Sequence, residues 1–126
     1  MVLVNIIGML PLTWSIKQLA MINARKKGNS FELAVINELK TIYGDNIQSS
    51  RLMSREMDNQ KVDIVGDVPF NIQCKATENI PQVHKIFDEI NRDKPPVIWW
   101  KKNYKRQVVI LEAETFLELL LQLNNK

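Results

Sequence analysis

One short stretch of the chain, residues 62–75, joins two apolar segments through a turn of Gly, Asp and Pro residues. Asp63 lies on the first segment, and Gln73 and Lys75 lie on the second. A strand would direct Gln73 and Lys75 to the same face, because side chains alternate along a strand. Asp63 is expected to lie on this same side of the hairpin. Metal-dependent phosphodiester hydrolysis uses such groups: oxygens bind a hard cation, and a lysine helps to deliver a hydroxide. These residues are therefore candidates for a catalytic metal site.

The opposite face of the second segment is predicted to be buried in the core. The residues that alternate with Gln73 and Lys75 on this face are Phe70, Ile72, Cys74 and Ala76. We accordingly expect Cys74 to be a small buried hydrophobic residue and not a nucleophile.

Composition limits what the chain can be. It has 126 residues, 45% of them hydrophobic and 25% charged, which is typical of one globular domain. The net charge of +3 and the pI of about 9.1 are compatible with an anionic partner. A single cysteine excludes an internal disulfide and an all-thiolate zinc site, and a single histidine, His84, excludes a His-rich cluster. Oxygen ligands remain, which favours Mg²⁺ or Mn²⁺.

The chain is predicted to have two parts. Residues 1–24 are expected to form an apolar appendage that packs on the domain or on a second subunit, and residues 25–126 form the domain. The apolar run from Met1 ends at Pro11, far short of the roughly 20 residues that a membrane span needs. We therefore expect no membrane partner and a cytoplasmic location.

Hydrophobic spacing predicts the elements of the domain. A helix is expected to begin at Asn29 or Ser30 and to end at Gly44. Its apolar residues, at helical spacing, are Phe31, Val35, Leu39 and Ile42. Then follow strands at 47–53, in both segments of the 62–75 stretch, at 97–100 and at 107–111, a polar loop at 54–60, and helices at 81–90 and from 113 onward. The order α-β-β-β-α-β-β-α predicts an α/β fold with one mixed β-sheet flanked by helices.

These elements and their residues resemble the PD-(D/E)xK nuclease superfamily over residues 25–122. Within it the chain is most like the small archaeal and phage Holliday-junction resolvases. Their chains also begin with a basic run, a Gly and a Glu-bearing helix, as residues 25–32 do here, and end in a strand and a leucine-rich helix, like residues 108–121. The resemblance implies a restriction-endonuclease-like fold, a role in DNA recombination and, for a phage-encoded chain, the host cytoplasm.

In that family a Glu on the first helix, an Asp on a strand and a (D/E)xK motif form the catalytic metal site. The resemblance assigns these roles to Glu32, Asp63, Gln73 and Lys75, with Mg²⁺ as the cofactor and Mn²⁺ as its substitute. Asp63, Gln73 and the Cys74 backbone carbonyl would hold the metal, and Glu32 would add a direct or water-mediated ligand. Lys75 would orient or activate the attacking water.

Two positions depart from the family motif. Val62 stands where the motif has its Pro, and Gln73 stands in place of the usual acid, so the site loses one negative charge. Mrr-type restriction endonucleases have a similar Gln-x-Lys. Glu32 also has a simpler interpretation, because its distance from Asn29 fits the reciprocal partner of a helix N-cap.

Three clusters of basic and polar residues frame the candidate site, and we expect them to contact the DNA backbone without reading its sequence. The first cluster is expected at a helix N-terminus, where free backbone N–H groups favour phosphate. The clusters are Arg25, Lys26 and Lys27; Arg51, Ser54 and Arg55; and Lys101, Lys102, Lys105 and Arg106.

The residues and the resemblance together predict a Mg²⁺-dependent endonuclease that cuts branched DNA. The resemblance implies a homodimer, because two symmetry-related strands must be cut. Trp99 and Trp100 should face opposite sides of a strand, one in the core and the other at an interface. Two alternatives stay open: a restriction-like or nicking nuclease that acts on duplex DNA, and a catalytically silent DNA-binding module of the same fold.

Overall fold

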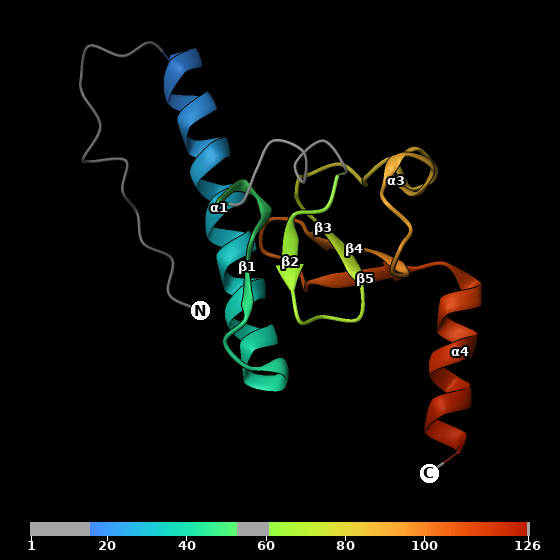
Figure 1. Ribbon diagram of the computed structural model, residues 1–126. Helices are drawn as coiled ribbons and strands as arrows, with labels where there is room; N and C mark the ends of the chain where they lie inside the picture. The colour runs from blue at the N-terminus through green and yellow to red at the C-terminus, as the bar shows by residue number, and fades with distance from the viewer. Residues whose placement is uncertain (1–15, 53–60, 126) are drawn as a thin grey trace.

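The structure, a computed structural model, describes residues 16–52 and 61–125 (Figure 1). Its helices and strands follow the predicted order α-β-β-β-α-β-β-α. In chain order the elements are α1 (Ile16–Tyr43), β1 (Ile47–Ser49), the 3₁₀ turn η2 (Ser50–Leu52), β2 (Ile64–Gly66), β3 (Asn71–Ala76), α3 (Val83–Glu89), β4 (Pro96–Lys101), β5 (Val108–Leu111) and α4 (Ala113–Asn124).

The described strands form one mixed sheet in the order β1-β2-β3-β4-β5. β3 and β4 are parallel and are connected through α3, whereas the other neighbouring strands are antiparallel. The predicted α/β class with a mixed sheet and helices is thereby confirmed. Because β3 and β4 are parallel, their carboxyl ends lie at one edge of the sheet, where Lys75 pairs with Trp100 and Ala76 with Lys101.

Alternate residues of the strands enter two separate apolar clusters. The α1 cluster consists of Phe31, Val35, Ile36, Leu39, Ile47, Ile64, Val68, Ile72 and Val97. The α3 cluster consists of Val62, Val65, Ile86, Phe87, Ile90 and Ile98. The predicted core face of β3 is confirmed, because Ile72 lies in the α1 cluster and Phe70, Cys74 and Ala76 pack against it.

The two tryptophans of β4 also alternate. Trp99 packs against the α1 cluster and Trp100 against the α3 cluster, so the prediction that they face opposite sides is confirmed. Both are half-buried, and both indole N–H groups are used within the chain. The Nε1 of Trp99 donates to Gln107 Oε1 at 2.9 Å, and that of Trp100 donates to the Thr77 carbonyl at 2.8 Å.

The first helix is longer than the sequence predicts. α1 runs without a break from Ile16 to Tyr43, through Gly28, so the predicted start just after that glycine is wrong. Glu32 accordingly lies in the helix interior, and its interpretation as the partner of an N-cap at Asn29 is wrong as well. A glycine inside a helix costs only about 1 kcal/mol relative to alanine, which does not end a helix whose next turns pack into the core.

Other element boundaries shift by small amounts. Ile42, which was predicted to lie on the core face of the helix, is 72% exposed. Ile36, which is 4% exposed, lies in the core instead. The predicted strand at 47–53 ends at Ser49 and continues as η2. The predicted loop at 54–60 and the apolar run at 1–12 lie outside the described residues. α1 crosses the predicted boundary between the appendage and the domain, and that division stays a prediction.

The last helix stands away from the sheet (Figure 1). Thr115 is the only buried residue described on α4. The exposed apolar residues of α4 and the adjacent strand, called the α4–β5 surface below, are Val108, Val109, Phe116, Leu117, Leu120, Leu121 and Leu123. None of the described helices combines the length and the apolar character needed to cross a membrane.

Candidate active site

Buried polar side chains concentrate in one region of the domain. Glu32, Ser49, Ser50 and Gln73, from α1, β1, η2 and β3, are all buried. Asn71 is buried too, but its amide holds the loop before β4 through several hydrogen bonds and so has a structural role. Within the described structure, Ser50 Oγ and Gln73 Oε1 are buried without a hydrogen-bond partner. Because an unpaired buried polar atom is costly, Gln73 Oε1, which belongs to a residue that lines the cleft described below, marks a candidate ligand position.

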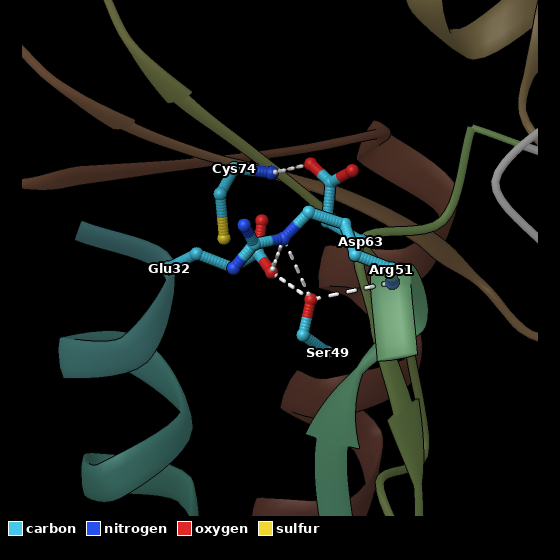
Figure 2. A network of polar contacts seen from close by, with 5 residues as sticks. All are labelled: Glu32, Ser49, Arg51, Asp63 and Cys74. Atoms are coloured by element: carbon cyan, nitrogen blue, oxygen red, sulfur yellow. Dashed lines mark hydrogen bonds and ion pairs between the residues drawn. The ribbon is translucent and has the colours of Figure 1, made fainter. Parts of the chain in front are cut away.

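Asp63 lies immediately before β2 and is fixed between η2 and β3. Its backbone N–H donates to the Ile72 carbonyl at 2.9 Å, and its own carbonyl accepts from the Ser50 N–H at 2.9 Å. Its side chain Oδ2 accepts a hydrogen bond from the Cys74 N–H at 2.8 Å (Figure 2). The predicted strand acid is thus held against the Gln73–Lys75 segment by its main chain and its side chain.

Gln73 and Lys75 line a cleft of about 440 Å³ on the side of the sheet that faces α3. Their predicted common face is therefore confirmed. Gln73 is 9% exposed, whereas Lys75 is half-buried. Two further lysines, Lys61 and Lys85, line the same cleft, together with the loop at 77–82. The cleft combines an unpaired amide oxygen and three lysines with two acids, Glu78 and Glu89, of which Glu78 forms an ion pair with Lys27. Lysines and oxygen donors together can bind a phosphate and its metal counter-ion.

Glu32 reaches the site from the opposite layer, α1 (Figure 2). Its Oε1 accepts a hydrogen bond from Ser49 Oγ and another from Arg51 Nε, the latter at 3.3 Å. Arg51 Nε also donates to Ser49 Oγ at 3.1 Å. Glu32, Ser49 and Arg51 therefore form a closed network in which the acid already has a cation beside it.

Cys74 lies between the two carboxylates. Burial raises the pKa of its thiol, and the negative charges of Asp63 and Glu32 raise it further. The thiol therefore stays protonated at neutral pH, and the prediction that Cys74 is not a nucleophile is supported.

The four predicted catalytic residues fall into two pairs. Asp63 was predicted on the same side of the hairpin as Gln73 and Lys75, but it does not line the cleft that these two share. Gln73 and Lys75 share the cleft, whereas Asp63 and Glu32 flank Cys74 and are not among the described residues that line the cleft. The bond between Asp63 and the Cys74 N–H joins the two pairs through the backbone of β3.

The oxygen donors of this region suit a hard divalent cation. Asp63 and Glu32 supply carboxylates, Gln73 supplies its unpaired amide oxygen, and Cys74 can supply a backbone carbonyl. Among the described residues, no three His, Cys, Asp or Glu side chains come together as a metal-binding group.

The predicted DNA contacts are only partly arranged as expected. Arg25 and Lys26 are exposed inside α1 and do not lie at a helix N-terminus, so the helix-end argument for binding phosphate is wrong. Lys27 lies 3.8 Å from Glu78 in an ion pair. Lys101 and Lys102 lie at the carboxyl end of β4, the sheet edge to which Lys75 also belongs.

Of the remaining predicted contacts, Lys105 and Arg106 are exposed in the turn before β5. Arg51 binds Glu32 in this structure. Ser54 and Arg55 lie outside the described residues.

Sequence reasoning missed Ser49, Lys61 and Lys85. Ser49 is signalled only by alternation in β1, where it lies on the same buried side as Ile47. Lys61 adopts a φ of 62°, which is rare for a residue with a side chain and is often found beside functional sites. The position of Lys85 depends on how α3 packs, which no local pattern reveals.

No family model, curated protein or solved structure matches the chain.

Proposed function

We propose that the chain is a Mg²⁺-dependent DNA endonuclease of the PD-(D/E)xK type that cuts branched DNA. One observation carries the proposal: the Asp63 carboxylate is bonded to the backbone of the Gln73–Lys75 segment, whose buried amide oxygen has no protein partner in the described structure. An acid, a neutral oxygen and a lysine on one hairpin match the residues that the sequence resemblance assigned to a catalytic metal site. The enzyme is proposed to work in the cytoplasm.

The residues would divide the chemistry among them. Asp63, Gln73 and the Cys74 carbonyl would hold Mg²⁺, with Glu32 as a further ligand. When bound, Mg²⁺ polarises the phosphate and lowers the pKa of water. Lys75, at the wall of the cleft, would orient the attacking water and stabilise the negative charge that develops on the phosphate.

The cleft supports DNA as the substrate. Lys61 and Lys85 would contact backbone phosphates on either side of the reacting one. Lys101 and Lys102 extend the basic surface along the sheet edge. Such contacts set affinity and position and carry no sequence information, so selectivity would come from the shape of the DNA.

The experiment that tests this function compares a labelled four-way junction with a linear duplex of the same sequence. Each is incubated with the full chain and Mg²⁺, Mn²⁺ or EDTA, and Lys75→Ala serves as the inactive variant. We expect metal-dependent cuts in the junction that disappear in the variant. Equal cutting of both substrates would instead indicate a duplex or nicking nuclease.

A second candidate is a catalytically silent DNA-binding module of the same fold. The ion pair between Glu32 and Arg51 favours it, because an acid neutralised within the protein attracts a metal less strongly. Gln73→Glu separates the candidates. Cleavage that appears only in this variant would identify a decayed site, whereas cleavage by the natural sequence would reject the silent module.

A further inference from the structure

The contact between Glu32 and Arg51 joins a buried charge to a partly exposed one. The Glu32 side chain is 9% exposed and that of Arg51 is 45% exposed, with Nε 3.3 Å from Oε1. The burial of a carboxylate is costly unless hydrogen bonds and a counter-charge compensate it. Ser49 Oγ supplies the first and Arg51 the second. Arg51 is therefore the cation that stabilises Glu32 in this structure.

The position of Arg51 is set by its neighbours in the chain. Its backbone N–H donates to Ser49 Oγ at 3.3 Å, and its Nε donates to the same oxygen at 3.1 Å. η2 therefore delivers the guanidinium to Glu32 (Figure 2), while the Arg51 side chain remains 45% exposed. A guanidinium can bind a carboxylate or a phosphate equally well, since its fork of donors fits both.

A metal at the proposed site would compete with this guanidinium. Asp63 Oδ2 is bonded to the Cys74 N–H, and Glu32 lies beside the Cys74 side chain (Figure 2), so a divalent cation drawn to the two carboxylates would approach the same region as Arg51. Two cations next to one carboxylate repel each other. The binding of a metal to Glu32 is therefore opposed as long as the guanidinium keeps its place.

We propose that Arg51 is a resident counter-cation of Glu32, which a divalent metal displaces and which then binds a DNA phosphate. This inference rests on the proposed function, since it requires a metal at Glu32 and Asp63. It makes the metal and DNA mutually dependent: each favours the state in which Arg51 has left Glu32, so each raises the affinity for the other. In the absence of DNA, the site binds metal weakly.

The direct test measures Mn²⁺ binding to the full chain without DNA, by the electron paramagnetic resonance signal of the free ion. Wild type is compared with Arg51→Gln and with Lys40→Gln, which removes the same charge from the last turn of α1. We expect Arg51→Gln to bind Mn²⁺ at least about fivefold more tightly, and Lys40→Gln to bind as wild type does. In a Glu32→Gln background the effect of Arg51→Gln should disappear.

A second measurement needs no variant and so does not depend on how Arg51→Gln folds. On titration of the wild type with Mg²⁺, the Arg51 Nε–H resonance should shift and exchange faster with water. Junction affinity measured with Ca²⁺ should exceed that measured with EDTA in wild type, and this gain should shrink severalfold in Arg51→Gln.

The outcomes separate this inference from the function on which it rests. Equal Mn²⁺ affinity in wild type and Arg51→Gln, or an unmoved Arg51 resonance in a protein that binds metal, rejects the counter-cation and keeps the metal site. No Mn²⁺ binding by either protein rejects the metal site itself.

Discussion

The Asp63 carboxylate accepts a hydrogen bond from the backbone N–H of Cys74, with Oδ2 and N 2.8 Å apart. Cys74 is the middle residue of the Gln73–Lys75 motif, so this bond fixes the position of the Asp63 carboxylate relative to Gln73 and Lys75. It also uses the N–H of the residue whose carbonyl is a candidate metal ligand. One hairpin thereby fixes the position of each group that the proposed chemistry requires from it.

The cleft lysines should act on DNA affinity. We expect Lys61→Gln and Lys85→Gln each to weaken junction binding severalfold and to reduce the slope of log K against log salt by about 1, because each removes one phosphate contact. Lys40→Gln, which changes a lysine outside the cleft, is the control. Fluorescence anisotropy over a range of salt concentrations measures both quantities. Unchanged affinity and slope in both cleft variants would contradict DNA binding at this cleft.

The hairpin could be predicted from the sequence because its signal is local. Alternation with a period of two placed Ile72 and Cys74 in the core and Gln73 and Lys75 together on the other face, as the structure has them. The turn residues between the two segments marked where the first strand ends and the second begins. Order and type of the other elements followed from similar short patterns.

The remaining features depend on contacts between distant parts of the chain. The continuity of α1 through Gly28 comes from packing of its later turns, which outweighs the weak local preference of a glycine. Glu32 accepts hydrogen bonds from Ser49 on β1 and from Arg51 on η2, and no sequence spacing relates these two residues to a position on a helix. Lys85 joins the cleft only because α3 packs against the sheet.

Two glycines should respond to alanine in opposite directions. Gly66 has a φ of +123°, and a Cβ there would lie 2.0 Å from the Asn46 carbonyl oxygen, so Gly66→Ala should destabilise the domain by about 2–4 kcal/mol. Gly28 lies inside α1 with nothing within 4 Å of its would-be Cβ, so Gly28→Ala should stabilise by about 0.5–1 kcal/mol. Urea unfolding gives both values. A Gly66→Ala variant as stable as wild type would contradict the pairing of β1 with β2.

Cys74 should make stability fall at alkaline pH. Burial, with the charges of Asp63 and Glu32, raises the pKa of its thiol above the ordinary value of 9.0. Below pH 9.0 the thiol is protonated in the folded and the unfolded chain, so its contribution does not change. At higher pH the unfolded chain loses this proton first, so the stability of wild type should fall relative to Cys74→Ala by about 1 kcal/mol per pH unit. Urea unfolding of both proteins at pH 8 and 10 tests this, and a constant difference would contradict it.

The α4–β5 surface is proposed as the interface of a homodimer. β5 is one of the two edge strands of the described sheet, and exposed apolar side chains lie on it and on α4, so the surface can pack against a second copy of itself. Leu117→Glu combined with Leu121→Glu should convert a dimer into a monomer, as measured by light scattering after gel filtration. Gln122→Glu adds charge to an exposed polar position of the same helix and should leave the dimer intact. A wild type that is monomeric at micromolar concentration would contradict the interface.

The most direct test of the catalytic metal site compares Asp63→Asn with Asp67→Asn in the cleavage of a labelled four-way junction with Mg²⁺ and Mn²⁺. An asparagine at position 63 can still accept the hydrogen bond of the Cys74 N–H, so the hairpin should be retained while the charge is lost. Asp67 lies exposed in the hairpin turn, and Asp67→Asn removes the same charge there. The proposed function predicts metal-dependent cutting by wild type and Asp67→Asn and a loss of about 100-fold or more, roughly 2.7 kcal/mol, in Asp63→Asn. Cutting by Asp63→Asn at the rate of wild type would contradict it.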